Sequence, residues 1–354
     1  MSFKYKQIMI TGGAGFVGSN LAIRLKSDHP EVTIIVLDNL KRRGSELILE
    51  RLKKYGIDFQ HADVRNKADL EGVSGDLIIE CSAEPSAQAG INGGLDYLVD
   101  TNLGGALNCL NLAAALKADF LFLSTSRVYP FDRIGELSFK ETATRFEFNT
   151  SAVKSGVSAK GISEDFPLAG VRTFYGATKL AAEYLIKEYI HFKKIKAIIN
   201  RCGLITGPWQ MGKVDQGVVV FWLAAHILGK PLKYIGWGGK QVRDFINISD
   251  LYELIKLQLD DFDAHSGSIF NVGGGRDFSF SLLELTKACQ KVTGRKIKIT
   301  DDPATRDGDI CWYIGDSSKA RACFDWAPRK NITQTLEEIN EWAQAHKKFI
   351  EAIV

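Results

Sequence analysis

The sequence of 354 residues has no long apolar run, no signal-peptide pattern and no block of like charge. No uninterrupted apolar run approaches the roughly 18 residues that span a bilayer. The first residues, MSFKYKQIMITGG, lack the apolar core of a secretion signal. The net charge is only +3 and no five or six basic residues stand together, so we expect no membrane anchor and no nucleic-acid partner.

Paired cysteines are also missing. The six cysteines are scattered, without C-x-x-C pairs, and neither they nor the six histidines show the spacing of a zinc site. Cys109 and Cys202 lie in apolar runs, which is typical of small core residues. We therefore expect a reducing compartment, the cytoplasm, and no metal.

Short apolar runs alternate with helical patterns. Candidate strands occur at the start of the chain and in VTIIVLDNL, DLIIECSA, ADFLFLSTS and KAIINRCGLITG. Helical patterns cover 102–117 and 177–192, and a capped helix is expected within 278–294. This alternation predicts an α/β fold, a Rossmann-type doubly wound parallel sheet with a smaller C-terminal substrate lobe.

The change of pattern after about residue 200 suggests the domain boundaries. We expect an NAD-binding domain at 1–200, to which 240–272 return. The smaller lobe is expected from 201–239 and 273–345.

A glycine-rich turn follows the first strand. TGGAGFVG places Gly12, Gly15 and Gly18 at equal spacing, with Phe16 and Val17 opening a helix. Such glycines let the backbone approach a pyrophosphate at a helix N-terminus, whose free N–H groups favour anions. Plain turns also use glycine, but the strand before and the helix after favour a dinucleotide.

An acidic residue ends the second strand about 20 residues later, as the dinucleotide fingerprint requires. Asp38 would accept hydrogen bonds from ribose hydroxyls and repel a 2′-phosphate, which favours NAD over NADP; Arg42 and Arg43 argue the other way. Asp63, followed by Val64, ends another short strand and is a candidate adenine contact or an exposed turn residue.

Tyr175 and Lys179 stand four apart at the start of a helical run, on one helix face. A cation near a phenol favours the phenolate and makes tyrosine a usable acid and base. Packing beside a solvated lysine is the alternative, since the pattern alone is common.

A hydroxyl cluster ends the run FLFLSTS with Ser124, Thr125 and Ser126. In sheets of this type ligands lie beyond the carboxyl ends of the strands. A turn or helix cap would explain the cluster alone. Together with the Tyr-Lys pair it predicts a hydroxyl that contacts a substrate oxygen.

These motifs in this order resemble the extended short-chain dehydrogenase/reductase family of nucleotide-sugar enzymes, from about residue 7 to 345. The matching segments are TGGAGFVGSN, LDNL, STSRVY, YGATK, GGKQVRDFINISD and NVGG. Within the family, VDQGVVVFW, GGKQVRD and ISEDFPLAGVRTFYGATK resemble the CDP-paratose 2-epimerase (CDP-tyvelose epimerase) branch.

The resemblance implies roles for individual residues. The catalytic group falls on Thr125, Tyr175 and Lys179. The implied NAD contacts are Gly12, Gly15, Phe16, Val17, Gly18, Asp38, Asn39, Asp63, Val64, Ala83, Asn102, Ser124, Tyr175 and Lys179. The implied substrate contacts are Thr125, Ser126, Gln210, Asp215, Gln216, Arg243 and Arg306, with the two arginines on the diphosphate.

The sequence also departs from the family pattern. Leu204 and Thr206 replace an asparagine and a tyrosine of many 4-epimerases, and Ser126 and Arg127 stand where dehydratases and decarboxylases carry an acid. The resemblance therefore implies an NAD-dependent epimerase, acting at C2 of a CDP-linked deoxysugar. The alternatives are a 4-epimerase or reductase of a UDP-, GDP- or dTDP-sugar and a non-catalytic dinucleotide sensor.

Two further expectations concern assembly and access. The helices around 102–118 and 177–190 have small faces that could pack between subunits of a homodimer or higher homo-oligomer, or within one chain. The long insertion 130–171 would form a lid over the pocket.

Overall fold

The chain forms two compact units in the computed structural model, which describes residues 3–151, 155–213 and 215–351. Unit 1 contains residues 1–125, 174–201 and 252–269, and unit 2 contains 126–173, 202–251 and 270–354. These limits differ from the expected ones. Residues 126–173 and 240–251 belong to unit 2, because their short strands pair with and pack on strands of that unit.

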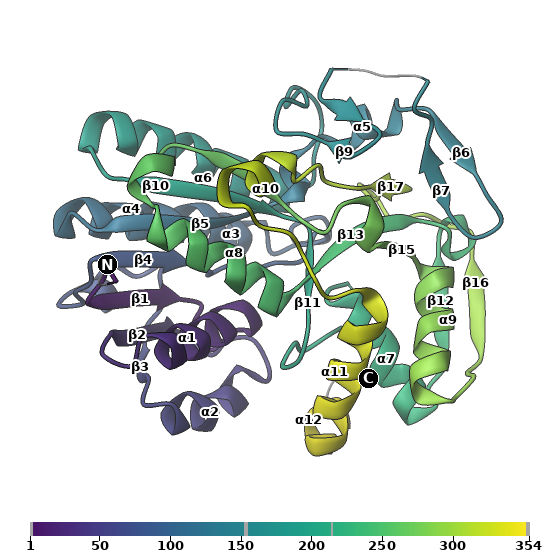
Figure 1. The fold of residues 1–354 in the computed structure, drawn as a ribbon, viewed down its shortest axis with the longest axis horizontal. Coiled ribbons are helices and arrows are strands. Elements are labelled where there is room, and N and C mark those ends of the chain that lie inside the picture. Colours follow the sequence, from purple (N-terminus) through teal and green to yellow (C-terminus); the bar gives the residue numbers. More distant parts are fainter. Residues whose placement is uncertain (1–2, 152–154, 214, 352–354) are drawn as a thin grey trace. The chain divides into compact units, whose positions relative to one another are not determined.

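Unit 1 is built on a twisted sheet (Figure 1). Its strands lie in the spatial order β3 (Asp58–His61), β2 (Thr33–Asp38), β1 (Gln7–Thr11), β4 (Leu77–Glu80), β5 (Asp119–Thr125) and β10 (Ala197–Cys202). The pairs from β3 through β5 are parallel. Numbered along the chain, this is the Rossmann order 3-2-1-4-5-6, whose direction reverses between β1 and β4. The predicted fold class is confirmed.

Continuous burial explains why these segments form central strands. Ile8, Met9 and Ile10 are fully buried, although successive side chains of a strand point to opposite faces. Both faces of the sheet are therefore covered, as parallel sheets require.

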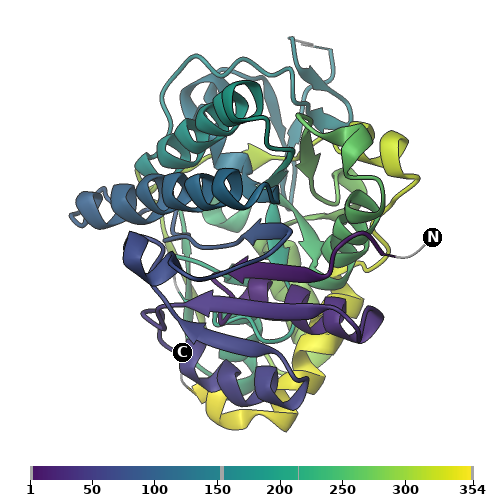
Figure 2. The same ribbon diagram turned by 90° about the vertical axis from the view of Figure 1, so that its left-hand side faces the viewer.

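Helices supply this cover on both sides (Figure 2). α4 (Gly105–Leu116) and α6 (Phe174–Glu188) lie side by side on one face. Cys109, Ala113, Ala182 and Ile186 join the core on that face. On the other face lies α1 (Phe16–Asp28), where the Tyr252 hydroxyl of α8 (Ile248–Asp260) donates to Asp28.

The remaining elements of unit 1 are short. They are η1 (Ser45–Ile48), α2 (Leu49–Lys54), η2 (Lys67–Leu70), α3 (Leu95–Val99), η3 (Asp100–Gly104), η5 (Tyr189–Lys193) and η7 (Asp263–His265). η3 and η5 are π-helical turns that precede α4 and follow α6. The chain passes from one unit to the other within β10, α8 and β14 (Ile269–Val272).

Unit 2 combines small sheets with three helices that pack together. β13 (Val242–Asn247) pairs with β11 (Leu204–Thr206), β15 (Ser279–Ser281) and β17 (Trp312–Tyr313), and β12 (Leu232–Ile235) pairs with β16 (Ile299–Asp302). The helices α7 (Val218–Leu228), α9 (Leu282–Thr293) and α11 (Ile332–Ala345) share an apolar core. Ser281 and Glu284 form a capping box at the start of α9, which confirms the predicted capped helix.

The segment 126–173 folds as a small turn, a helix and two hairpins. These are η4 (Ser126–Val128), α5 (Phe131–Gly135), β6 (Phe139–Glu141) with β7 (Phe146–Phe148), and β8 (Val157–Ser158) with β9 (Gly161–Ile162). The Phe148 ring lies 5.7 Å from the Trp312 ring, and Ile162 bridges to Gly315. The other elements of unit 2 are η6 (Trp237–Gly239), η8 (Arg276–Phe278), α10 (Ser318–Phe324) and α12 (Lys347–Glu351).

Candidate active site

The chemically active side chains of unit 1 gather at the carboxyl ends of its strands. β5 ends at Thr125, β4 at Glu80, β1 at Thr11 and β2 at Asp38, in this order across the sheet. The direction of the strand order reverses between β4 and β1, where open α/β sheets bind their ligands.

The glycine turn after β1 is built for close backbone approach. Gly12 has φ +61°, and a Cβ added to it would lie 2.8 Å from the Cys81 carbonyl carbon. A Cβ on Gly18 would lie 2.5 Å from the Gly12 oxygen. A larger residue at either position would push the turn apart. The sequence prediction of a tight turn between β1 and α1 is thus seen in the structure.

The N-terminus of α1 is open to an anion. Its N-cap residue is Gly15, no side chain caps it, and the helix starts with Phe16 and Val17. Uncapped N–H groups and the helix dipole favour a phosphate group at this point. The turn and the helix end together fit the pyrophosphate of a dinucleotide.

The Asp38 carboxylate is placed to accept hydrogen bonds from hydroxyl groups. Its Oδ2 accepts from the Ala14 N–H at 3.1 Å and its Oδ1 from the Leu40 N–H at 2.8 Å. Burial raises the pKa of Asp38, while these two hydrogen bonds act against the rise. A carboxylate has about four acceptor positions, so each oxygen keeps one for a ribose hydroxyl.

Asn39 and Asp63, two of the predicted cofactor contacts, lie next to each other. The Asn39 amide donates to Asp63 at 3.0 Å, and Arg65 donates to the same carboxylate. Arg65 holds the pKa of Asp63 well below its usual range. Val64 packs against Gly105, where an added Cβ would lie 2.6 Å from a Val64 methyl. Asp63 therefore stays ionised beside Asn39.

Two of the expected NAD contacts, Asn102 and Ser124, form hydrogen bonds with other parts of the protein through their side chains. The Asn102 amide bonds both the N–H and the carbonyl of Glu84 and lies 3.3 Å from the Thr178 hydroxyl. It ties the loop after β4, which includes Ala83, to α6. Ser124 donates to Glu183 at 2.5 Å.

The three predicted catalytic residues all belong to unit 1. Thr125 is the last residue of β5, and Tyr175 and Lys179 occupy the first two turns of α6. Tyr175 is partly exposed, whereas Lys179 is 2% exposed. A phenol at the surface with a buried ammonium one turn further along the helix suits acid-base chemistry, because the cation is shielded from water.

Among the described residues, Lys179 contacts Glu80 and Phe122. Its Nζ lies 3.6 Å from Glu80 Oε2 and 4.0 Å from the centre of the Phe122 ring. The first distance is too long for a hydrogen bond and describes a contact between charges. Burial raises the pKa of Glu80, and Lys179 opposes this rise.

A second buried ion pair anchors the same helix. The Arg201 guanidinium on β10 donates to both oxygens of Glu183, at 2.7 Å for Nη2 and 3.1 Å for Nε. Glu183 follows Lys179 by four residues, so both charges face the sheet. α6 is therefore fixed to β4 at one point and to β5 and β10 at the next.

The sequence analysis missed Glu80, Glu183 and Arg201. A signal for Glu80 was present, since LIIE ends a buried strand on an acid in the same way as IIVLD ends on Asp38. A second signal was the i, i+4 spacing of Lys179 and Glu183.

The substrate-binding arginine predicted from the resemblance is a half-buried member of a charge cluster in unit 2. Arg243 donates to Asp309 and to the Ile310 carbonyl, both at 2.7 Å, and Arg127 lies 3.7 Å from the same carboxylate. Burial lowers the pKa of Arg243 to about 10. Burial alone would raise the pKa of Asp309, but Arg243 and Arg127 hold it below its ordinary value. Two cations share one anion, which leaves a net positive charge.

The other predicted substrate contacts have different settings within unit 2. Gln210 is buried and bonds the Thr206 hydroxyl and the Ile205 carbonyl. Asp215 lies 3.4 Å from Lys213, and the backbones of Lys213 and Gln216 pair with each other. Ser126 starts η4, and the Arg306 backbone carbonyl accepts a turn hydrogen bond from the Asp309 N–H. The Gln210 amide thus also stabilises the loop that carries it.

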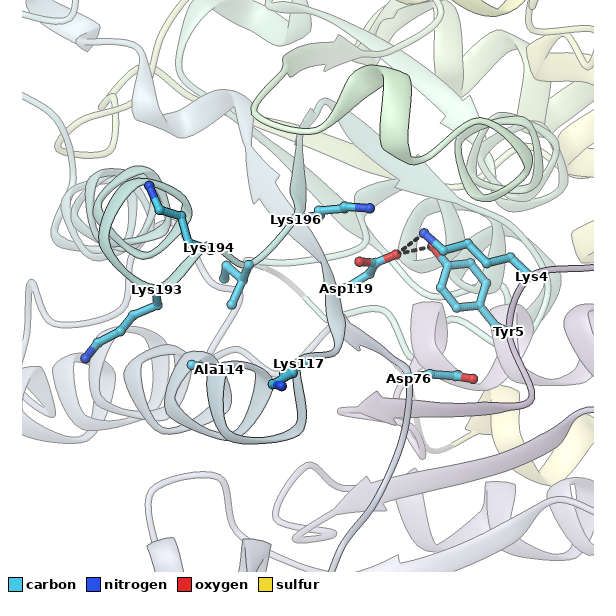
Figure 3. Close-up of a pocket in the computed structure, with 10 residues that line it drawn as sticks. Lys4, Tyr5, Asp76, Ala114, Lys117, Asp119, Lys193, Lys194 and Lys196 are labelled. Carbon is cyan, nitrogen blue, oxygen red and sulfur yellow. Dashed lines mark hydrogen bonds and ion pairs between the residues drawn. The ribbon is translucent and has the colours of Figure 1, made fainter.

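A pocket of about 300 Å³ lies at the opposite edge of the sheet in unit 1 (Figure 3). It lies where the strands begin, beside Asp76 and Asp119, and Lys4 and Tyr5 donate to Asp119 there. The other residues that line it are Ala114, Lys117, Lys193, Lys194, Ile195 and Lys196. Lys117 and Lys194 end helices, where a cation is stabilised by the dipole. This pocket is not the cofactor site.

The described residues offer neither a metal site nor a membrane-spanning helix. They contain no group of three or more side chains suited to a metal ion. No helix in the described ranges is long and apolar enough to cross a bilayer.

The strand order, the glycine turn and Asp38 define a dinucleotide-binding domain of the Rossmann class. The chain belongs to the NAD dependent epimerase/dehydratase family, which it matches over residues 8–273. It is therefore an NAD-dependent enzyme of the epimerase/dehydratase type, and the turn, the open helix end and Asp38 fit the cofactor.

Known proteins resemble the chain over nearly its whole length. CDP-paratose 2-epimerase of Salmonella typhi is 27% identical, over 96% of this chain and 99% of that protein. UDP-glucuronic acid decarboxylase 4 of Arabidopsis thaliana is 30% identical over 94% of this chain and 67% of that protein. The structure of UDP-glucuronic acid 4-epimerase from Bacillus cereus, with UDP-glucuronic acid and NAD, has a TM-score of 0.76 at 22% identity, covering 96% and 99% of the chains. This structural likeness shows the shared fold.

Proposed function

We propose that the protein is an NAD-dependent epimerase of nucleotide sugars and that it inverts C2 of a CDP-linked deoxysugar. One observation carries the proposal: the Tyr175-Lys179 pair stands on α6, with the ammonium buried, in the unit that holds the glycine turn and Thr125. The end-to-end similarity to a CDP-paratose 2-epimerase supports the choice of sugar and carbon.

The residues have distinct tasks in this reaction. The glycine turn and Asp38 would hold NAD, which would supply a reversible acceptor for a hydride from a sugar carbon. The Tyr175 phenolate takes the proton of the hydroxyl on that carbon and gives it back after the sugar has turned over. The Thr125 hydroxyl hydrogen-bonds the same oxygen. Lys179 favours the phenolate by its charge and bonds the ribose of the cofactor.

The positive cluster of unit 2 supports a role in substrate binding. Arg243 and Arg127 share Asp309, and Arg306 adds a third cation to the same segment. Guanidinium groups bind phosphate oxygens in a fixed fork. We assign the diphosphate to Arg243 and Arg306, and the sugar to Ser126, Gln210, Asp215 and Gln216.

Other members of the family offer the alternatives. A 4-epimerase or a reductase acting on a UDP-, GDP- or dTDP-sugar uses the same Tyr-Lys pair. Similarity to UDP-glucuronic acid decarboxylases is of the same order as that to the 2-epimerase. Against dehydration and decarboxylation stands the sequence after Thr125, where Ser126 and Arg127 provide no acid.

The test is turnover of a panel of CDP-, UDP-, GDP- and dTDP-sugars, with the products identified by NMR. We expect inversion at C2 of a CDP-deoxysugar without added cofactor. Tyr175→Phe should lower the rate by about 10²–10⁴-fold, because the proton loses its acceptor. NAD content and the far-UV circular dichroism spectrum should remain. An undiminished rate would remove Tyr175 from the mechanism, and a need for stoichiometric NADPH would indicate a reductase.

The proposal also includes the oligomeric state of the protein and its cellular compartment. Leu107 on α4, Tyr184 on α6 and Phe192 on η5 are 36%, 52% and 69% exposed, which favours a homodimer through these helices. No disulfide joins the six cysteines, all of which lie in the described residues, and this supports a reducing compartment such as the cytoplasm. Sedimentation of the purified protein at the monomer mass of 39.2 kDa would overturn the dimer.

A further inference from the structure

Glu80 is a buried acid for which the reaction described above has no task. It is 1% exposed at the carboxyl end of β4, in register with Thr11 of β1. Its Oε2 has no hydrogen-bond partner among the described residues, and the nearest cation is the Lys179 ammonium at 3.6 Å. A buried carboxylate lowers the stability of the folded state unless a cation lies close to it.

The ammonium of Lys179 depends on Glu80 in the same way. The lysine is 2% exposed, and its other close neighbour is the face of Phe122, 4.0 Å away. A ring face attracts a cation but carries no net charge. Without a counter-charge a buried ammonium favours the neutral amine, which would no longer stabilise a phenolate.

The remaining titratable groups on the packed elements do not replace Glu80. Glu183, also on α6, is occupied by Arg201 of β10 and by Ser124 of β5. On α4, burial and Glu80 raise the pKa of the Cys109 thiol well above its usual value, so this group stays neutral. In the part of the chain that the structure describes, Glu80 is the carboxylate that lies against Lys179.

We propose that Glu80 is a positioning residue for the catalytic pair: it keeps Lys179 charged and held beneath the first turns of α6, so that the Tyr175 phenol can ionise. The proposal rests on the proposed function only in its use of the Tyr-Lys pair. The long contact suits the task, since a lysine has three donors and a charge contact leaves them available to the cofactor.

The experiment is a titration of the Tyr175 phenol by NMR, in protein labelled with ¹³C at tyrosine Cζ and carrying its NAD. Tyr175→Phe identifies the signal. In Glu80→Gln, which keeps the shape and loses the charge, we expect the midpoint of ionisation to rise by about one pH unit or more. Glu80→Asp restores the charge and should bring the midpoint back towards that of the native protein.

Glu183→Gln is the matched control, with the same substitution against the same helix. It leaves Arg201 as an extra positive charge, so the midpoint should stay or fall. An unchanged or lower midpoint in Glu80→Gln would overturn the proposal. An equal rise in both glutamine variants would also overturn it, because the cause would then be a general loosening of α6.

A second measurement covers the case in which Glu80→Gln folds poorly. Glu80→Gln should lower the urea midpoint of the native protein, but not that of a Lys179→Met variant, if the two charges stabilise each other. Equal losses in both backgrounds would contradict the pairing. The phenol titration needs no sugar, so a shifted midpoint without turnover of any nucleotide sugar would refute the proposed function and leave this inference standing.

Discussion

The buried carboxylates of the two units have different hydrogen-bond and charge partners. In unit 1, Glu183 receives three hydrogen bonds from the Arg201 guanidinium, and Glu80 lies against Lys179. In unit 2, Asp244 on β13 is 1% exposed, and its Oδ2 accepts the Gly275 N–H at 3.2 Å. The guanidinium of its chain neighbour, Arg243, is bonded to Asp309 instead.

The pKa values follow from this difference. Burial raises the pKa of Asp244 to about 7, because hydrogen bonds from the backbone offset only part of the lost hydration. A carboxylate held by a guanidinium, such as Glu183, ties its helix to the sheet. An acid held by backbone N–H groups changes charge near neutral pH. Unit 1 thus pairs its buried carboxylates with cations beside its catalytic residues, whereas the buried Asp244 of unit 2 is held by backbone N–H groups and titrates.

Breaking the tight pair of unit 1 should have the largest effect on stability. Arg201→Met leaves Glu183 buried without a cation, and we expect the free energy of unfolding to fall by about 3–5 kcal/mol. Urea denaturation followed by circular dichroism measures the change. In the double variant with Glu183→Met most of the loss should be recovered, because no charge then remains unpaired. A double variant as unstable as the single one would show that packing, and not charge, was lost.

The sheet of unit 1 could be predicted because each signal there is local. Apolar runs, the glycine turn and Asp38 lie within short stretches, and a parallel sheet with right-handed crossovers leaves few ways to connect them. Unit 2 has strands of two to six residues, and β13 pairs with three strands from distant parts of the chain. Such pairings depend on contacts far apart in the sequence, so residues 126–173 were assigned to the wrong unit.

Some residues of the candidate site could also be predicted from the sequence, and others could not. Thr125, Tyr175 and Lys179 stand in recognisable motifs, and the structure brings them into one unit. Glu80 and Arg201 act through partners 99 and 18 positions away (179 − 80; 201 − 183), and no spacing rule joins such pairs. Gln210 is a predicted substrate contact, and its amide also bonds the loop that carries it, which the sequence did not predict. Motifs identify reacting groups better than they identify the groups that hold them.

The titrating acid of unit 2 should make the stability of the protein depend on pH. The Asp244 carboxyl titrates near pH 7 when folded and near 3.8 when unfolded. Between these values the native state holds a proton that the unfolded state has released, so the free energy of unfolding should fall as the pH rises from about 4 to 7. The slope is at most about 1.4 kcal/mol per pH unit, and it should flatten above pH 7.

Asp244→Asn should reduce this slope, because an amide does not titrate. The substitution fits the site: the amide oxygen can accept the Gly275 N–H, and Oδ1 of Asp244 has no partner among the described residues. Urea midpoints of both proteins from pH 4.5 to 8 measure the difference. The slope that the Asp244→Asn variant retains reports the other groups, including Glu80, whose pKa is also raised. If the urea midpoints of the two proteins changed with pH in the same way, Asp244 would be ionised over the whole range. The two units would then differ in the geometry around their buried carboxylates and not in the charge of those groups.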